Sequence, residues 1–267
     1  MTPFLAIVFL VFGLILGSFL NVVIIRLNTR ESFFGSLGGR SGCMSCQNKL
    51  TWYELIPVFS FLGLRGRCKN CRNKISLQYP LVELMSGFIF ALLFLKLQDI
   101  FFLNTFDFSF TYAFYAFIFS LLIVIAVYDL KHKIIPDILS LVLGLLALAG
   151  LFFLQTDGSL SFSPHLPTLL EFFSGPIIAV PFVFFWLVSS GRWMGLGDAK
   201  LAISLGWLLG LVGALSATVF AFWIGSVAGL SLVIFSHKKH GMKSEIPFAP
   251  FLVLGTLLVF LFDLYLF

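Results

Sequence analysis

Charged residues are scarce in this sequence. Asp, Glu, Lys and Arg together make up 11% of its 267 residues, whereas a soluble domain carries about 25%. Hydrophobic residues make up 60%, 35 residues are Phe, and the mean hydropathy is +1.05. This composition excludes an ordinary water-soluble domain and predicts a protein that crosses the membrane several times.

The apolar residues fall into eight plausible spans, each approaching the roughly 20 residues that a membrane helix needs. We therefore expect an all-α polytopic membrane protein with about eight transmembrane helices. Residues 199–235 would make a helix of about 55 Å, nearly twice a bilayer, so we expect two spans there with a turn near Gly210 and Gly213. The first segment lacks a basic start and a small-residue cleavage site, so it is expected to be a span and not a removed signal peptide. The expected spans are 4–25, 81–97, 109–128, 138–155, 172–189, 199–212, 214–235 and 249–267.

Basic residues are confined almost entirely to four loops. Loop 26–80 carries nine, 129–137 two, 190–200 two and 236–247 three, whereas the opposite loops carry only Lys96. The positive-inside rule then places the four basic loops in the cytoplasm and both termini outside it. Topology and contact with anionic membrane lipid explain the net charge of +5, and no nucleic-acid partner is expected.

Cysteine is also rare, and all four cysteines lie in one loop as two Cys-x-x-Cys pairs, Cys43/Cys46 and Cys68/Cys71. Two such pairs supply four thiolates, the ligand set of a closed structural zinc site. Disulfides and a redox pair are the alternatives, but thiols in a cytosolic loop stay reduced, which disfavours disulfides. We expect a structural zinc ion, because four sulfurs leave no open coordination position.

Only one segment, residues 26–80, is long enough to fold outside the membrane. A core of this size usually needs a metal or disulfides to hold it together, in keeping with the four cysteines. We expect three parts: a first transmembrane helix (1–25), a zinc-ribbon-like cytoplasmic loop domain with the four cysteines (26–80) and a transmembrane core (81–267).

Two aspartates, Asp129 and Asp198, lie at the ends of apolar segments. An acid close to the hydrocarbon costs roughly 2.5–3.5 kcal/mol at a helix centre, so it usually has a function. Together the two could perform acid/base chemistry, one activating water while the other protonates a carbonyl. Structural roles are the alternatives: Asp198 as a helix N-cap, and Asp129 neutralised by Lys131 or Lys133. For Asp137, which follows Pro136, capping alone is a sufficient explanation.

Other protease chemistries find no support in the sequence. There is no His-Glu-x-x-His motif for a zinc protease. Gly39-Arg40-Ser41-Gly42 contains the Gly-x-Ser-Gly of intramembrane serine proteases, but it lies in a polar loop. The four histidines all fall in loops, so none is available within a helix to activate that serine.

Several motifs, in order along nearly the whole chain, resemble the bacterial prepilin peptidases, or type 4 prepilin leader peptidases. Asp129-Leu130 followed by Ile135-Pro136-Asp137 resembles the first catalytic motif of that family. Gly195-Leu196-Gly197-Asp198 followed by Lys200-Leu201 resembles the second, the Gly-x-Gly-Asp signature shared with presenilin-type proteases. The remaining matches are Gly17-Ser18-Phe19-Leu20-Asn21-Val22-Val23, Leu64-Arg65-Gly66-Arg67-Cys68 and Tyr79-Pro80-Leu81-Val82-Glu83-Leu84.

The resemblance implies an aspartic endopeptidase of the bacterial inner membrane, with Asp129 and Asp198 as catalytic acids. Its substrates would be type IV prepilins and type II secretion pseudopilins, which lose a short basic leader at the cytoplasmic face. Many members also methylate the new amino terminus with S-adenosylmethionine; the residues that would bind this cofactor are unknown. Glu83 has two interpretations, a part of the methylation site or a structural acid at the membrane interface. A protease without methyltransferase activity is the alternative function.

The chain departs from the family pattern at Asn28, Met44, Glu54-Leu55 and Ala249, and none of these positions is expected to affect the two aspartates or the cysteines. Two other classes of protein remain as rivals. A proton-coupled transporter would carry protons on Asp129 and Asp198 but should have inverted repeats and broken helices near mid-membrane. A non-catalytic assembly scaffold would tolerate replacement of either aspartate by asparagine.

Overall fold

The structure, a computed structural model, describes residues 2–27, 41–155, 161–162, 164–235 and 246–267. The chain divides into two compact units, Met1–Asp99 and Ile100–Phe267, and each is described by itself. Residues 28–40, with Asn28 and the first two residues of Gly39-Arg40-Ser41-Gly42, and most of the basic loop 236–247 lie outside the described residues.

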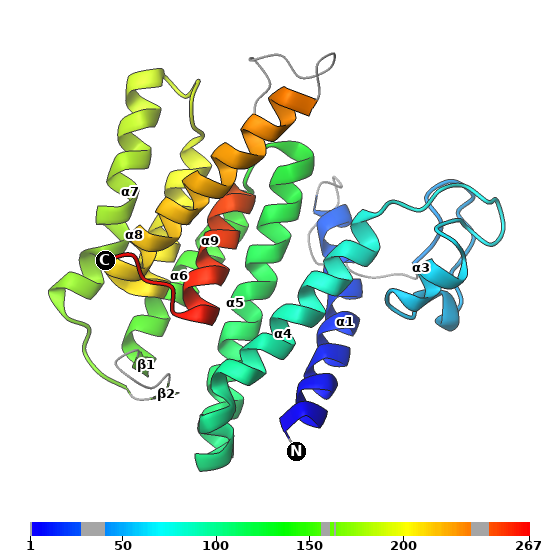
Figure 1. The fold of residues 1–267 in the computed structure, drawn as a ribbon, viewed down its shortest axis with the longest axis horizontal. Coiled ribbons are helices and arrows are strands. Elements are labelled where there is room, and N and C mark those ends of the chain that lie inside the picture. Colours follow the sequence, from blue (N-terminus) through cyan, green and yellow to red (C-terminus); the bar gives the residue numbers. More distant parts are fainter. Residues whose placement is uncertain (1, 28–40, 156–160, 163, 236–245) are drawn as a thin grey trace. The chain divides into compact units, whose positions relative to one another are not determined.

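The first unit contains two long helices and a small loop region. Its elements are α1 (Thr2–Arg26), η1 (Trp52–Leu55), α3 (Phe59–Gly63) and most of α4 (Gln78–Leu103). Figure 1 shows α1 and α4 side by side. Small residues permit this close packing: a Cβ on Gly13 would lie 2.7 Å from the Cβ of Phe90, and one on Gly87 would lie 2.9 Å from Leu14 Cδ2.

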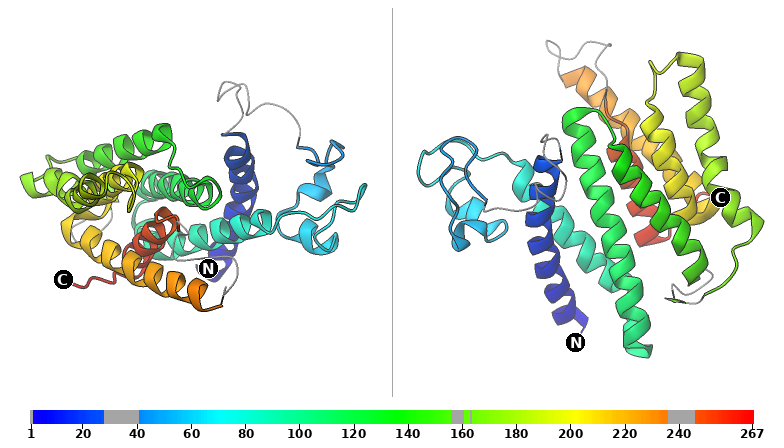
Figure 2. Two further views of the ribbon diagram at one scale, coloured as in Figure 1. Left: turned by 90° about the horizontal axis from the view of Figure 1, so that it is seen from above. Right: turned by 180° about the vertical axis from the view of Figure 1, so that it is seen from behind.

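The second unit is a bundle of helices. Helix α8 packs against α6, α7 and α9, and α9 also packs against α5. In Figure 2, the first half of α8 lies along α7 and the second half along α9, in agreement with the close approaches of Gly206 to Gly175 and of Gly255 to Ala217. The elements are α5 (Thr105–His132), α6 (Asp137–Phe153), β1 (Leu154–Gln155), β2 (Ser161–Phe162), α7 (Leu169–Ser189), α8 (Leu196–Phe235) and α9 (Ala249–Phe262).

The prediction of an all-α membrane protein is confirmed. Five described helices, α1, α4, α5, α7 and α8, are long and apolar enough to cross a membrane, and α6 and α9 are shorter apolar helices. Helix α8 contains two of the expected spans, and its regular geometry breaks at Gly210, where φ is 70° and ψ is 178°. Only glycine adopts this conformation readily, and it lies where the sequence predicted a turn between two spans.

The start of α8 is fixed by its contact with α7. A Cβ on Gly206 would lie 2.6 Å from the Cα of Gly175, so the two backbones touch. The Ser174 hydroxyl donates a hydrogen bond to the carbonyl oxygen of Gly206 at 2.8 Å, and Trp207 Nε1 donates one to the carbonyl oxygen of Phe172 at 2.9 Å. Close backbone contact with hydrogen bonds between helices is the usual way to hold helices together in lipid.

Candidate active site

Asp129 lies in the last turn of α5. The helix ends because Lys133 takes the left-handed conformation, with φ 55°, and its N–H donates to the carbonyl oxygen of Asp129 at 2.7 Å. The Asp129 side chain is turned inward and is only 5% exposed. Its Oδ2 accepts a hydrogen bond from the backbone N–H of Ala249 at 3.3 Å. Lys131 and Lys133 are exposed. The Asp129 carboxylate is therefore buried against the start of α9, and it is not neutralised by either lysine.

Ala249 is the first residue of α9 and is fully buried. The free N–H groups at a helix N-terminus carry partial positive charge, which favours a carboxylate. The expectation that position 249 has no bearing on the aspartates is therefore wrong. The reason is that the contact comes from the backbone, so the identity of the side chain gave no sign of it.

Asp198 lies in the first turn of α8, which begins at Leu196, and it is 8% exposed. Its own N–H donates to the carbonyl oxygen of Gly195 at 3.2 Å. A Cβ on Gly197 would lie 3.0 Å from the Cβ of Ile135, so the glycine lets this turn approach the segment that follows Asp129. As the third residue of the helix, Asp198 does not occupy the N-cap position that was the alternative for it.

The structure brings Asp129 and Asp198 together. The two carboxylates lie close enough for their negative charges to repel each other. Both are largely removed from solvent, so this repulsion is weakly screened. Two buried carboxyl groups that repel each other favour a state in which only one of them is ionised, which provides one acid and one base in the same region.

Asp137 does not have the capping role that the sequence suggested. Pro136 is the N-cap residue of α6, without a side-chain capping bond, and Asp137 lies in the first turn. The Asp137 Oδ1 is 2.6 Å from the Nζ of Lys200. This ion pair links the start of α6 to the turn of α8 that carries Asp198. Sequence reasoning missed it, because the two residues are 63 positions apart.

The four cysteines come together in the first unit, and their Sγ atoms all lie within 4.8 Å of one another. Cys43 Sγ and Cys71 Sγ are 3.8 Å apart, about the edge of a tetrahedron with zinc–sulfur bonds of about 2.3 Å. All four are free thiols. Hydrogen bonds from the backbone of Cys46 and Ser45 lower the pKa of the Cys43 thiol to about 6, which favours the thiolate that binds metals.

The two Cys-x-x-Cys turns have the same backbone geometry. The N–H of Cys43 donates to the carbonyl oxygen of Asn48 at 3.0 Å, and the N–H of Cys68 donates to that of Asn73 at 2.9 Å. The Asn73 side chain also hydrogen-bonds to Ser45, which joins the two turns. A repeated turn of this kind presents its two sulfurs in the same way each time, as a four-sulfur metal site requires.

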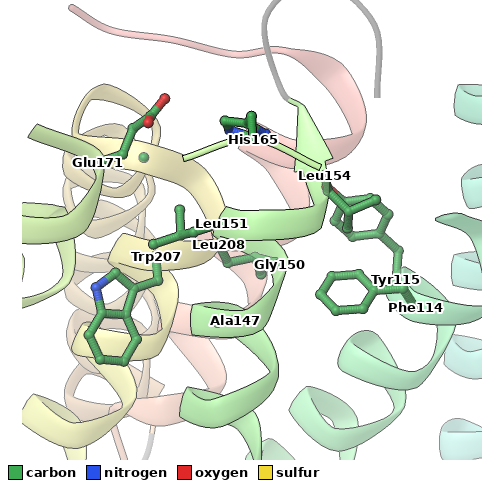
Figure 3. Close-up of a pocket in the computed structure, with 11 residues that line it drawn as sticks. Phe114, Tyr115, Ala147, Gly150, Leu151, Leu154, His165, Glu171, Trp207 and Leu208 are labelled. Atoms are coloured by element: carbon green, nitrogen blue, oxygen red, sulfur yellow. The ribbon is translucent and has the colours of Figure 1, made fainter. Parts of the chain in front are cut away.

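Figure 3 shows a pocket in the second unit that none of the predicted site residues lines. It is lined by residues from α5, α6, α7 and α8 together with Leu154 and His165, and its polar groups include His165 and Glu171. Glu171 accepts a hydrogen bond from the N–H of Thr168 in a helix-capping arrangement. Neither Asp129 nor Asp198 lines this pocket.

Comparison with known proteins identifies similarity along the chain. Residues 11–97 match the bacterial peptidase A24 N-terminal domain, and residues 116–234 match the type IV leader peptidase family. No solved structure matches the chain.

Three similar proteins, each named prepilin leader peptidase/N-methyltransferase, illustrate the likeness. One from Xanthomonas campestris pv. campestris is 32% identical over 93% of this chain and 88% of its own length. One from Bacillus subtilis is 33% identical over 94% and 92%, and one from Vibrio cholerae is 30% identical over 95% of both.

Proposed function

Because this chain belongs to the type IV leader peptidase family, we propose that it removes the short basic leader of type IV prepilins and type II secretion pseudopilins. The reaction takes place at the cytoplasmic face of the membrane, and Asp129 and Asp198 are its catalytic acids. The observation that carries this assignment is the buried pair of carboxylates in the second unit.

Each aspartate has a distinct role in this mechanism. The N–H of Ala249 and the positive end of α9 favour a negative charge on Asp129, so Asp129 accepts the proton of the attacking water. Asp198 holds a proton and gives it to the carbonyl oxygen of the scissile amide. The water oxygen bonds to the carbonyl carbon, the C–N bond breaks, and a proton ends on the leaving amine.

The four-cysteine cluster fits a structural zinc site. The separation of Cys43 Sγ and Cys71 Sγ, 3.8 Å, matches the edge of a zinc tetrahedron. All four sulfurs lie within 4.8 Å of one another, and Cys43, Cys46, Cys68 and Cys71 would fill all four positions. The metal would hold together a loop that is too small to fold on an apolar core alone. It would take no part in peptide cleavage.

A second activity is proposed from the relatives, whose name includes N-methyltransferase. This chain would then transfer a methyl group from S-adenosylmethionine to the new amino terminus of the cleaved product. A protease without this activity is the alternative. The first unit is the part that matches the N-terminal family domain, and we assign the methylation site to it.

The proposed location is the bacterial inner membrane, with both termini outside the cytoplasm and the four basic loops inside. The three-part division into residues 1–25, 26–80 and 81–267 is also retained as a proposal. The apolar helix of the substrate would dock among the membrane helices from the lipid, with its leader reaching the two acids at the cytoplasmic side. Membrane lipid and the prepilin substrates are the expected partners.

The test is cleavage of a co-expressed prepilin, measured by gel shift and by the mass of the new amino terminus. Wild type should cleave, and Asp129→Asn and Asp198→Asn should each abolish cleavage. Asp107→Asn, the same change at a half-buried position in the first turn of α5, serves as the control and should cleave as wild type does. Cleavage by either stably inserted active-site variant would refute the proposed mechanism.

A further inference from the structure

Helices α1 and α4 enclose a polar cluster near the start of α4, where Glu83 contacts Val58 of the loop region. A Cβ on Gly17 would lie 2.7 Å from the Cα of Glu83 and 3.0 Å from the Cβ of Ser86, so the two helices are in close backbone contact at this glycine. Even so, three polar side chains at this contact are more than nine-tenths buried: Asn21, Glu83 and Ser86. Peptide cleavage by Asp129 and Asp198 does not use any of them.

Glu83 has neutral partners only. Its Oε2 accepts a hydrogen bond from the backbone N–H of Val58 at 2.7 Å, and the Ser18 side chain also hydrogen-bonds to the carboxylate. Among the described residues, no cation contacts this group. A buried carboxylate in a membrane helix is costly unless a positive charge compensates it.

Two further oxygens in the cluster lack partners. The Nδ2 of Asn21 donates to the carbonyl oxygens of Tyr79 at 3.1 Å and Gly17 at 3.3 Å, which directs this side chain toward α4. Its Oδ1 accepts nothing, and the Ser86 hydroxyl is also unpaired. Buried polar groups are nearly always hydrogen-bonded, so this cluster presents three acceptors to a donor that it does not itself contain.

The one backbone donor on Glu83 is held in an unfavourable conformation. Val58 has φ 61° and ψ −49°, and a β-branched residue at positive φ is a true outlier. Such strain persists only where the surroundings enforce it, and it often marks a functional site. A stronger donor at Glu83 would let this turn relax, because Val58 would no longer be needed there.

We propose that Asn21, Glu83 and Ser86 form a binding site for a primary ammonium group, and that the Val58 turn moves aside when the group binds. A primary ammonium offers three N–H donors and one positive charge, which matches one carboxylate and two neutral oxygens. The ligand we infer is the new amino terminus of the cleaved substrate. This identification rests on the proposed methyltransferase activity.

The site would distinguish product from precursor. Before cleavage, the same nitrogen is a neutral amide with a single N–H and cannot satisfy three acceptors. After cleavage it is charged and has three donors. The cluster would thus accept the product only once the leader has been removed. For methylation, Glu83 would take one proton from the bound ammonium, so that the freed nitrogen lone pair forms the bond to the methyl carbon as the carbon–sulfur bond of S-adenosylmethionine breaks and S-adenosylhomocysteine leaves.

Binding can be measured apart from both reactions. The probe is a synthetic peptide with the mature amino terminus of a type IV pilin, made with a free and with an acetylated α-amino group, and tested on the full chain in lipid nanodiscs. Wild type should bind the free amine about 10- to 100-fold more tightly. Glu83→Gln should lose most of this preference, and Glu54→Gln, an acid in η1 of the same unit, should keep it.

Ser86→Ala provides a second variant, because it removes an unpaired hydroxyl and breaks no hydrogen bond. It should fold as wild type does and weaken the preference severalfold. The proposal is overturned if wild type binds the free and the acetylated peptide equally well. It is also overturned if the Glu83→Gln protein still prefers the free amine as wild type does. If Glu83→Gln does not fold, an unchanged preference in Ser86→Ala overturns it.

Methylation is read separately, from the mass of the cleaved product in cells, as an increment of about 14 Da. Two results together support both the ammonium site and the methyltransferase activity. Wild type should give cleaved product with this increment, and Glu83→Gln should give cleaved product without the increment. Methylated product from Glu83→Gln overturns the site. Absence of the increment from wild type refutes the methyltransferase activity, and the peptide-binding assay then decides the site alone.

Discussion

Lys200, the fifth residue of α8, and Asp137 in the first turn of α6 form an ion pair with 2.6 Å between Nζ and Oδ1. Asp137 follows Asp129 by eight positions, and Lys200 follows Asp198 by two. The pair therefore joins the two segments that carry the acids. Both side chains are well exposed, so the pair should add little stability, about 0–1 kcal/mol, and we infer that it helps to position the two acids.

We expect Lys200→Met and Asp137→Asn each to lower the rate of prepilin cleavage about tenfold, because a small misplacement of reacting groups is costly. Thermal stability should change little. The charge-swapped double variant, Lys200→Asp with Asp137→Lys, should recover part of the activity, and Lys200→Arg should recover most of it. Wild-type rates in both single variants would show that the pair does not position the acids.

The contact of α7 with α8 predicts a steric effect at one glycine. Gly206→Ala would place a Cβ 2.6 Å from the Cα of Gly175, so the helices must separate, and we expect a loss of about 1–3 kcal/mol in stability with reduced cleavage. Gly229→Ala, on the same helix, meets only Ile246 Cδ1 at 3.5 Å and should be neutral. Thermal unfolding in detergent measures both. Equal stability of the two variants would contradict the close packing.

At Gly210 we expect a substitution to lower stability through backbone conformation and not through steric crowding. A Cβ there would meet nothing within 4 Å, but φ is +70°. Gly210→Ala should therefore destabilise the protein by about 1–3 kcal/mol through backbone strain alone. The same unfolding assay applies, again with Gly229→Ala as the control. An alanine tolerated at 210 would mean that α8 does not need the break.

The cysteine cluster predicts one zinc ion per chain, measurable by elemental analysis of the purified protein. Cys43→Ser or Cys68→Ser should lose the metal and expose the loop to protease, since a structural zinc site needs all four thiolates. Met44→Ala changes an exposed residue between two of the ligands and should keep full zinc content. Zinc retained by both serine variants would refute the four-cysteine assignment.

Hydropathy and composition were enough to predict the all-α membrane fold and a break in α8 near Gly210, because long apolar runs in a membrane can form few structures other than helices. That α8 makes two spans stays a prediction. Cysteine spacing was enough to predict a four-sulfur cluster. Both aspartates could be selected because acids are rare beside apolar segments. Their catalytic roles stay a prediction.

The partners of these residues could not be predicted. The donor to Asp129 is a backbone N–H far along the chain, and a backbone group carries no signature in sequence. In the sequence, the position of Asp137 directly after Pro136 indicated only a helix cap. Its partner Lys200 comes close to it only in the folded protein. The backbone contact between Gly175 and Gly206 depends on how each helix is rotated about its own axis. A membrane helix that is apolar on all sides gives no sequence pattern from which this rotation could be predicted.

The hydrogen bond from Ala249 to Asp129 spans 120 residues, and this separation has a consequence for biogenesis. A ribosome that has synthesised α5 and α8 has made both aspartates, but the donor that holds Asp129 arrives only with α9. A nascent chain thus lacks the complete site until its insertion is nearly finished. In the proposed mechanism, in which Asp129 is catalytic, the order of synthesis would therefore delay proteolytic activity until the enzyme is assembled in the bilayer.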